Sequence, residues 1–132
     1  MDRNCADKIQ FHADVVTIIE EEYTPDFIVH GFHLGESEPE QGGQHWNFTR
    51  CLEDDDGVCI KREIQQVVVY GGFVTCTLSR RHFICEFDEE TSKQTMTRKL
   101  HITFEIDDES WDGLQKQASL VFKGESYFSL IV

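Results

Sequence analysis

The chain has 132 residues, and its 39% hydrophobic side chains include ten Phe, enough for one domain with a buried core. Its net charge of −13 repels nucleic acid and anionic membranes and favours a basic partner. Residues 1–60 hold 14 Asp and Glu against 3 Lys and Arg, a net of −11, and residues 9–49 contain no Lys or Arg. The negative charge is therefore concentrated in one half of the chain.

The chain shows none of the segments that carry a protein into or across a membrane. No run approaches the roughly 18 apolar residues of a membrane span, and the start of the chain lacks the apolar stretch of a signal peptide. Five cysteines, an odd number, favour reduced thiols over a disulfide framework. We therefore expect a soluble cytoplasmic protein, in which the glycosylation sequon at Asn47 is not used.

The first half of the chain predicts β-strands joined by acidic loops. Residues 9–19 alternate in steps of two, with Ile9, Phe11, Ala13, Val15 and Ile19 on one side. The three glutamates at 20–22 end that pattern, and residues 24–26 form a turn. An apolar run at 27–34, an exposed loop at 35–43 and an alternating strand at 45–52 follow. A second acidic loop at 53–57 precedes a strand that ends at residue 70.

The second half of the chain predicts a hairpin, a regular strand and one long helix. The Gly71-Gly72 pair allows positive φ angles and predicts a bend before a strand at 73–78. Residues 82–87 complete a hairpin with that strand, and residues 99–106 form the most regular strand. A helix capped by Asp107 or Asp108 runs to Gly124, and residues 127–132 form a last strand.

These elements together predict the fold class. No internal repeat or linker divides the chain, so we expect a single domain over residues 1–132. The fold class is α+β, with a mainly antiparallel β-sheet of about six to seven strands and one C-terminal α-helix packed on one face.

Three segments resemble one protein family in the type and order of their elements. They are WNFTRCL at 46–52, YGGF at 70–73 with LSR at 78–80, and LHITFEIDDE at 100–109 with the helix to residue 122. In this pattern the chain resembles the immunity protein 10 family of bacterial polymorphic toxin systems. The resemblance covers residues 46–124 and leaves the acidic first 45 residues outside. It implies an antidote that is made alongside a toxin and acts by binding it, with no catalytic residues to carry over.

The sequence predicts no metal site and no cofactor. An EF-hand alignment places Gly57 at the sixth position and Glu63 at the twelfth, but a leucine then stands at the first, and the flanks are predicted strands. His30 and His33 could join His45 as zinc ligands. Residues three apart on a strand face opposite sides, however, which spoils the convergence that tetrahedral zinc needs.

The cysteines and histidines leave a small enzyme with a Cys/His site as an alternative. A cysteine nucleophile needs a base within hydrogen-bond reach, and no nucleophile elbow or family-type cysteine signature is present. A two-residue turn at Arg80-Arg81 would place Cys76 opposite Cys85, close enough for a disulfide. Two reduced thiols packed as small hydrophobes are the simpler interpretation. We expect no enzymatic activity.

The acidic clusters are the candidate site. A one-sided negative field steers basic proteins toward the surface and speeds their association. The leading hypothesis is a toxin-neutralising immunity protein, a monomer or weak homodimer, that binds a cognate toxin domain with a basic surface and blocks it by occlusion. The carboxylates expected at the contact are Glu20, Glu21, Glu22, Asp26, Glu36, Glu38, Glu40, Asp54, Asp55 and Asp56.

Two further features bear on an interface. Phe27, Phe32 and Trp46 could anchor it, although their alternation favours the core. A self-associating structural module, joined through the apolar residues 127–132, is a third hypothesis for the chain.

Overall fold

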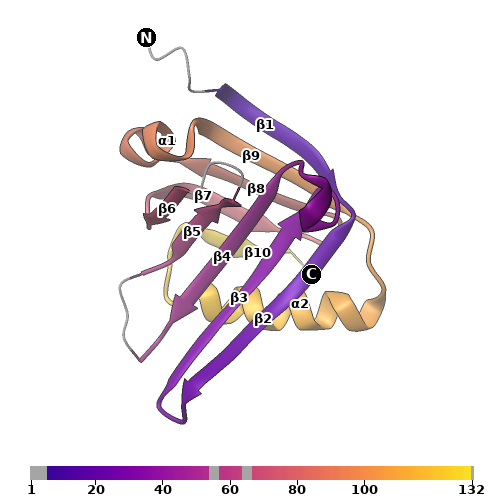
Figure 1. Cartoon of the computed structure of the whole chain (residues 1–132). Helices are drawn as coiled ribbons and strands as arrows, with labels where there is room; N and C mark the ends of the chain where they lie inside the picture. The colour runs from indigo at the N-terminus through magenta and orange to yellow at the C-terminus, as the bar shows by residue number, and fades with distance from the viewer. Residues whose placement is uncertain (1–5, 54–56, 64–66, 132) are drawn as a thin grey trace.

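Two β-sheets face each other across one hydrophobic core, and two helices pack against them (Figure 1). The structure, a computed structural model, describes residues 6–53, 57–63 and 67–131. Within these ranges the chain forms ten strands, five in each sheet. Residues 15–70 build one sheet, and the segments before and after them build the other.

The sheet built by residues 15–70, which we call sheet B, consists of consecutive strands. Its strands are β2 (Val15–Thr24), β3 (Phe27–Gly35), β4 (His45–Cys51), β5 (Cys59–Arg62) and β6 (Val67–Tyr70). They lie in sequence order with antiparallel pairing throughout, as short connections require. β2 and β6 are therefore the edge strands. A short 3₁₀ helix, η1 (Pro39–Gln41), lies in the loop between β3 and β4.

The second sheet, sheet A, combines strands from both ends of the chain. Its strands are β1 (Ala6–Ala13), β7 (Phe73–Leu78), β8 (His82–Phe87), β9 (Thr97–Phe104) and β10 (Phe128–Leu130). The order is β1-β9-β8-β7-β10. The central pairs are antiparallel, whereas β1 and β10 pair with their neighbours in parallel.

β1 and β2 are two extended segments separated only by Asp14, at which the chain passes from sheet A to sheet B. Ala13 is buried at the end of β1, and the next side chain packed against the core is that of Val16, three residues later. The alternation therefore shifts by one residue where the chain changes sheets. The prediction that Val15 and Ile19 lie on the same side as Ala13 is wrong for this reason.

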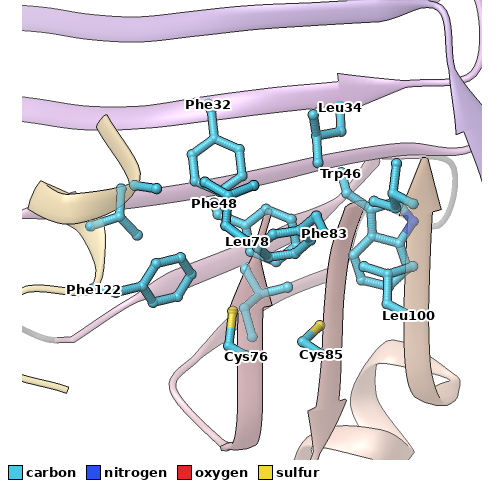
Figure 2. Packing of buried hydrophobic residues seen from close by; sticks show 14 of the residues in the cluster. Phe32, Leu34, Trp46, Phe48, Cys76, Leu78, Phe83, Cys85, Leu100 and Phe122 are labelled. Atoms are coloured by element: carbon cyan, nitrogen blue, oxygen red, sulfur yellow. The ribbon is translucent and has the colours of Figure 1, made fainter. Parts of the chain in front are cut away.

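The core lies between the inner faces of the two sheets and is dominated by aromatic rings (Figure 2). The ring centroid of Phe48 on β4 lies 5.4 Å from that of Phe32 on β3 and 4.9 Å from that of Phe83 on β8. Such ring pairs contribute about 0.5–1.5 kcal/mol each beyond the burial of their area. Figure 2 shows the sulfur atoms of Cys76 and Cys85 side by side on sheet A, beneath these rings.

The long helix α2 (Asp108–Val121) packs against β2, β3 and β4. It begins after Asp107, whose side chain accepts a hydrogen bond of 2.8 Å from Ser110 N, and this bond lowers the pKa of Asp107. Gln117 Oε1 accepts a hydrogen bond of 3.2 Å from Gly31 N, which ties the helix to β3. The buried side chains of the helix follow helical spacing and are Trp111, Leu114, Gln117, Ala118 and Val121.

The short helix α1 (Glu89–Thr95) packs against β6, β8 and β9. Asp88 caps it by accepting a hydrogen bond of 2.8 Å from Thr91 N. Gly72 has a φ of 96°, and a Cβ there would lie 1.6 Å from Thr91 Oγ1, so the approach of α1 requires glycine. The sequence does not predict this helix, because its buried side chains are the small polar ones of Thr91, Ser92 and Thr95.

The predicted α+β class is confirmed, as is a C-terminal helix packed on a sheet face. The predicted bend is confirmed by the φ angles of Gly71 and Gly72, which are 71° and 96°. The described residues hold more strands than predicted and divide them between two sheets. The reason is that two segments predicted as single strands, the one at 9–19 and the one ending at 70, each contain two.

Candidate functional site

Seven of the ten predicted contact carboxylates lie on β2 or in the turn and loop that flank β3. The hairpin of β2 and β3 that carries them is seen in Figure 1. Glu20 pairs with His30, six positions before Glu36, and Asp26 stands ten positions before Glu36, so the separations along β3 run from about 20 to about 33 Å at about 3.3 Å per residue. One group, the acidic tip, consists of Glu20, Glu21, Glu22 and Asp26, and the other, the acidic loop, consists of Glu36, Glu38 and Glu40. All seven side chains are exposed. The remaining predicted contacts, at residues 54–56, lie outside the described residues.

The acidic tip exists because β2 continues through its glutamates. The strand stays paired with β3 as far as Thr24, so the prediction that the glutamates at 20–22 end it is wrong. Pairing with β3 provides hydrogen-bond partners for the backbone N–H and C=O groups on that side of β2. The hairpin extends past the neighbouring strands (Figure 1), and the side chains of its tip are exposed to solvent. The predicted turn is confirmed at Pro25 and Asp26, between the two strands.

Tyr23 is a large exposed aromatic side chain beside the acidic tip, with 64% of its surface accessible. Its ring meets that of Phe27 edge-on at a centroid distance of 5.9 Å, and its hydroxyl donates a hydrogen bond of 2.8 Å to Glu21 Oε2. That hydrogen bond and the charge of Glu21 raise the pKa of Tyr23. An exposed tyrosine held by two neighbours loses little freedom when a partner covers it.

The acidic loop is closed by its own hydrogen bonds. Ser37 Oγ donates a hydrogen bond of 2.7 Å to Gly42 O, and Glu36 Oε1 accepts one of 3.3 Å from Gln44 N. Gly42 and Gly43 have φ angles of 79° and 85°, a conformation that favours glycine. The loop thus keeps its carboxylates at the surface beside the start of β4.

The carboxylates of both groups have no lysine or arginine partner among the described residues. In the described part of the chain, no Lys or Arg nitrogen lies within 4.0 Å of any of the seven. Glu20 lies 3.4 Å from His30 Nδ1. In the second half of the chain, by contrast, Glu86 lies 3.9 Å from Lys99, and Glu89 has Lys93 as an ion-pair partner. Lysine and arginine side chains of the described residues therefore do not pair with the negative charge of the tip and the loop.

A shallow depression of about 220 Å³ opens on the outer face of sheet B. Its lining includes Phe27 and Val29 of β3, Cys51 of β4, Cys59 of β5 and Tyr70 of β6. On β4 and β5 these positions alternate with core residues, so the depression faces away from the core. It lies beside the acidic tip because Phe27 in its lining directly follows Asp26, and it offers a partly apolar recess for a partner's side chain.

The structure divides the aromatic residues that the sequence offered as anchors. Trp46 and Phe32 are fully buried, as their alternation predicted, whereas Phe27 lines the depression. Two exposed aromatic rings of sheet B were not predicted as anchors: Tyr23, beside the acidic tip, and Tyr70, which lies on β6 at the opposite edge of the sheet and lines the depression. Their signal in the sequence is weak, because Tyr23 directly follows three exposed glutamates and Tyr70 ends an apolar run in which Val69 belongs to the core.

Cys76 and Cys85 lie opposite each other in the core. The backbones of Ser79 and His82 exchange hydrogen bonds of 2.8 and 3.4 Å, which confirms the two-residue turn at 80–81. Both thiols are free, and burial raises the pKa of Cys76 and of Cys85. An activated nucleophile needs the opposite shift, so these two thiols give the enzyme alternative no support.

The predicted last strand is confirmed as β10, which is shorter than predicted. It pairs with β7 and lies at the edge of sheet A. A second copy of the chain would therefore have to join at that edge if residues 127–132 mediated self-association.

One group of side chains has the composition of a metal site, namely His33 of β3, His45 of β4 and Glu63 after β5. The alternation of β3 places His30 on the side of Phe32 and His33 on the opposite side, as predicted. His33 is instead met by His45 from the next strand. His33 and His45 each lie on the side of their strand that faces away from its core residues. This is the one sign in the sequence that the two side chains meet.

No protein-family model matches this chain, and no curated protein or solved structure matches it. Of the helices in the described residues, neither has the length and apolar character needed to cross a membrane. The resemblance to the immunity protein 10 family therefore stays a prediction.

Proposed function

We propose that this protein is a toxin-neutralising immunity protein, which binds a cognate toxin domain with a basic surface through the β2–β3 hairpin and blocks its activity by occlusion. The observation that supports this is the acidic tip and the acidic loop, whose carboxylates have no described Lys or Arg within 4.0 Å. Such a surface attracts a basic protein and repels anionic polymers. The resemblance of residues 46–124 suggests the toxin as the partner, and the odd number of cysteines, which favours reduced thiols, suggests the cytoplasm as the place of action.

Both acidic groups fit within a single interface. A standard interface buries about 800 Å² on each partner, which corresponds to a patch about 32 Å across. The nearest carboxylates of the acidic tip and the acidic loop, Glu20 and Glu36, are about 20 Å apart along β3. A partner that lies along the hairpin therefore meets both groups, and its basic residues would have to be spread over a similar length.

β2 offers a backbone contact besides its charge. It is an edge strand that pairs with β3 on one side, so the N–H and C=O groups of its other side face away from the sheet. A strand of the toxin could extend sheet B there. Acidic side chains on the edge also disfavour pairing between two copies of this protein, because like charges would meet.

Charge and anchors have separate roles in this proposal. The carboxylates raise the rate of encounter, and this effect weakens as salt screens it. The tightness of the complex depends on a few desolvated side chains, for which Tyr23 and the depression beside Tyr70 are the candidates. Occlusion follows if the basic surface of the toxin includes its active-site groove.

The test compares two variants that lose the same number of charges. The tip variant carries Glu20→Gln, Glu21→Gln, Glu22→Gln and Asp26→Asn. The matched control carries the same kinds of change at exposed positions of the second half, namely Glu90→Gln, Glu105→Gln, Glu109→Gln and Asp112→Asn. Association with the toxin domain encoded beside the gene is measured by stopped-flow fluorescence over a range of salt concentrations. We expect the tip variant to associate at least about tenfold more slowly, with a flatter salt dependence, and the control to stay within about twofold.

Growth rescue in bacteria tests the biological role. The toxin domain is co-expressed with the wild-type chain, the tip variant or the control, and survival is scored against toxin alone. Rescue by the wild type and the control supports the proposal. Equal slowing of both variants would show that net charge, not the tip, guides the partner. Failure of the wild type to rescue, with both proteins produced, would refute the antidote function.

A further inference from the structure

Three neighbouring segments of sheet B bring two imidazoles and a carboxylate together. His33 Nε2 lies 3.1 Å from His45 Nδ1, and the ligand atoms of His33, His45 and Glu63 all lie within 4.8 Å of one another. His45 is buried, and the other two side chains are half-buried. We propose that these three residues bind a divalent transition-metal ion, with Zn²⁺ as the expected ion because imidazole and carboxylate are among its usual ligands. This proposal does not depend on the toxin-binding function.

Hydrogen bonds on the far side of the two rings determine which nitrogens carry protons. His45 Nε2 lies 2.8 Å from Gly42 O, and a carbonyl oxygen only accepts, so Nε2 carries a proton. His33 Nδ1 bonds to Asn47 Oδ1. That amide is oriented by Glu63, because Asn47 Nδ2 donates a hydrogen bond of 3.1 Å to Glu63 Oε1. His33 Nδ1 therefore carries a proton as well.

The two nitrogens that face each other are consequently both unprotonated in the neutral rings. A neutral imidazole carries one proton, so His33 Nε2 and His45 Nδ1 present lone pairs to each other at 3.1 Å. Two lone pairs repel unless a cation lies between them. A metal ion uses both, and the bonds to Asn47 and Gly42 are the kind that orient metal-binding histidines.

The spacing of the nitrogens also fits zinc. Two nitrogens about 2.05 Å from a tetrahedral ion are about 3.3 Å apart, and the observed separation is 3.1 Å. Glu63 supplies the third ligand with the oxygen that Asn47 does not occupy. Water or a group from a partner would complete the tetrahedron.

Gly35 keeps the space between the two rings open. A Cβ at this position would lie 2.6 Å from His45 Nδ1 and 2.8 Å from His33 Nε2, so it would contact both proposed ligand nitrogens. Gly35 is not one of the glycines with a positive φ, so the backbone alone does not require glycine there. The acidic loop begins at the next residue, Glu36, and adds negative potential that favours a cation.

A second histidine pair provides a comparison within the same molecule. His82 Nδ1 lies 2.9 Å from His101 Nε2 on sheet A, but among the described residues no third ligand completes a group there. Burial, His82 and the positive charge of Lys8 lower the pKa of His101, and that lysine also repels a metal cation. We expect this pair to bind Zn²⁺ much more weakly than the pair on sheet B.

The test is calorimetric titration of the reduced, metal-free full chain with Zn²⁺. We expect one tightly bound ion per chain. His33→Gln and Glu63→Gln should each weaken binding at least about tenfold, and the control His82→Gln should leave the affinity within about twofold. Positions 33 and 63 are half-buried, and far-UV circular dichroism checks that the variants fold.

Two further measurements locate the ion and identify its ligands. Gly35→Ala should weaken Zn²⁺ binding at least about tenfold without removing any ligand, because its methyl group occupies the space of the ion. Co²⁺ in place of Zn²⁺ should show d–d absorption without the thiolate charge-transfer band that the cysteines would produce. Absence of a bound ion, unchanged affinity of the His33→Gln variant, or a thiolate band would each overturn the proposal.

Discussion

Sheet A and sheet B enclose the same core, but their inner faces carry different chemistry. Sheet B places two arginines inside. Arg50 Nη1 donates hydrogen bonds of 3.1 and 2.8 Å to the carbonyl oxygens of Val121 and Lys123 at the end of α2, and Arg62 Nη1 donates one of 2.7 Å to Thr95 O of α1. Sheet A instead places two thiols inside. The helices are thus bonded to sheet B by buried polar contacts.

The outer faces of the two sheets also differ in how their charged side chains are arranged. On sheet A, acidic and basic side chains are interspersed, as Lys99 and Glu86 show with a separation of 3.9 Å. On sheet B, the acidic tip and the acidic loop have no lysine or arginine partner among the described residues. Sheet B therefore carries two kinds of charge. The carboxylates on its surface do not serve the fold, whereas the arginines on its inner face do. Three predictions test this difference. They concern a buried arginine of sheet B, the buried thiols of sheet A and the exposed carboxylates of the acidic tip.

The largest expected effect comes from the buried arginine of β4. Arg50→Ala removes the partner of two carbonyl oxygens at the end of α2 and of Glu125, which lies 3.5 Å from Arg50 Nη1. We expect the free energy of unfolding to fall by about 4 kcal/mol, because these groups are left without their cation. Arg80→Ala, at a side chain that is 40% exposed, should cost less than about 1 kcal/mol. Urea unfolding of both variants measures the difference, and equal costs would remove the distinction between the sheets.

The second prediction concerns the thiols of sheet A at high pH. Burial raises the pKa of Cys76 and Cys85, so both stay protonated in the native state while the unfolded chain ionises above its ordinary value of 9.0. The unfolded state then binds fewer protons, and stability falls as pH rises through that value. Each thiol should lower the free energy of unfolding by about 1.4 kcal/mol at pH 10, or about 3 kcal/mol together.

Denaturant unfolding at pH 8, 9 and 10 measures this loss. A Cys76→Ala, Cys85→Ala variant is less stable at pH 8 but should lose about 3 kcal/mol less than the wild type between pH 8 and pH 10. Equal losses of unfolding free energy in the wild type and the variant would contradict the expectation that both buried thiols stay protonated. Tyr127, whose pKa burial also raises, ionises in the unfolded chain only toward the upper end of this range.

The smallest effect is expected at the acidic tip. Glu21→Gln with Glu22→Gln removes two exposed carboxylates that have no ion-pair partner among the described residues. We expect stability to change by less than about 0.5 kcal/mol, and to rise rather than fall at low salt because repulsion within the tip decreases. Thermal unfolding at about 0.01 M and about 1 M salt checks the sign. A clear loss of stability would show that the tip serves the fold.

Much of the fold was predictable where one face of a strand is buried. Residues 45–52 and 99–106 alternate because their odd or even positions meet the core, and that pattern is visible in the sequence. The division at Asp14 was not predictable, because the start of β2 carries apolar residues on both sides, with Val15 and Ile19 on one and Val16 and Ile18 on the other, so the shift in phase leaves no mark in the sequence. The helix α1 was missed since it has no apolar stripe.

The candidate sites were predictable only as residue types. The carboxylates at 20–22 and 36–40 are evident in the sequence, but their separation to opposite ends of one hairpin depends on how far β2 extends. The meeting of His33 and His45 depends on the register of β3 against β4, in which His33 pairs with Asn47 and Gly35 with His45. The loop between these strands sets that register, and its length alone does not reveal it.

The order of the strands also has a consequence for synthesis on the ribosome. Ala6 of β1 pairs with Thr97 of β9, so at about 5–20 residues per second β1 waits roughly 5–18 s for its partner. Sheet B, whose strands are consecutive, can pair in that interval, but its inner aromatic rings stay uncovered until sheet A and α2 emerge. The nascent chain at this stage carries nearly all of the protein's excess negative charge. The same carboxylates proposed to meet a toxin would therefore keep the half-made protein in solution.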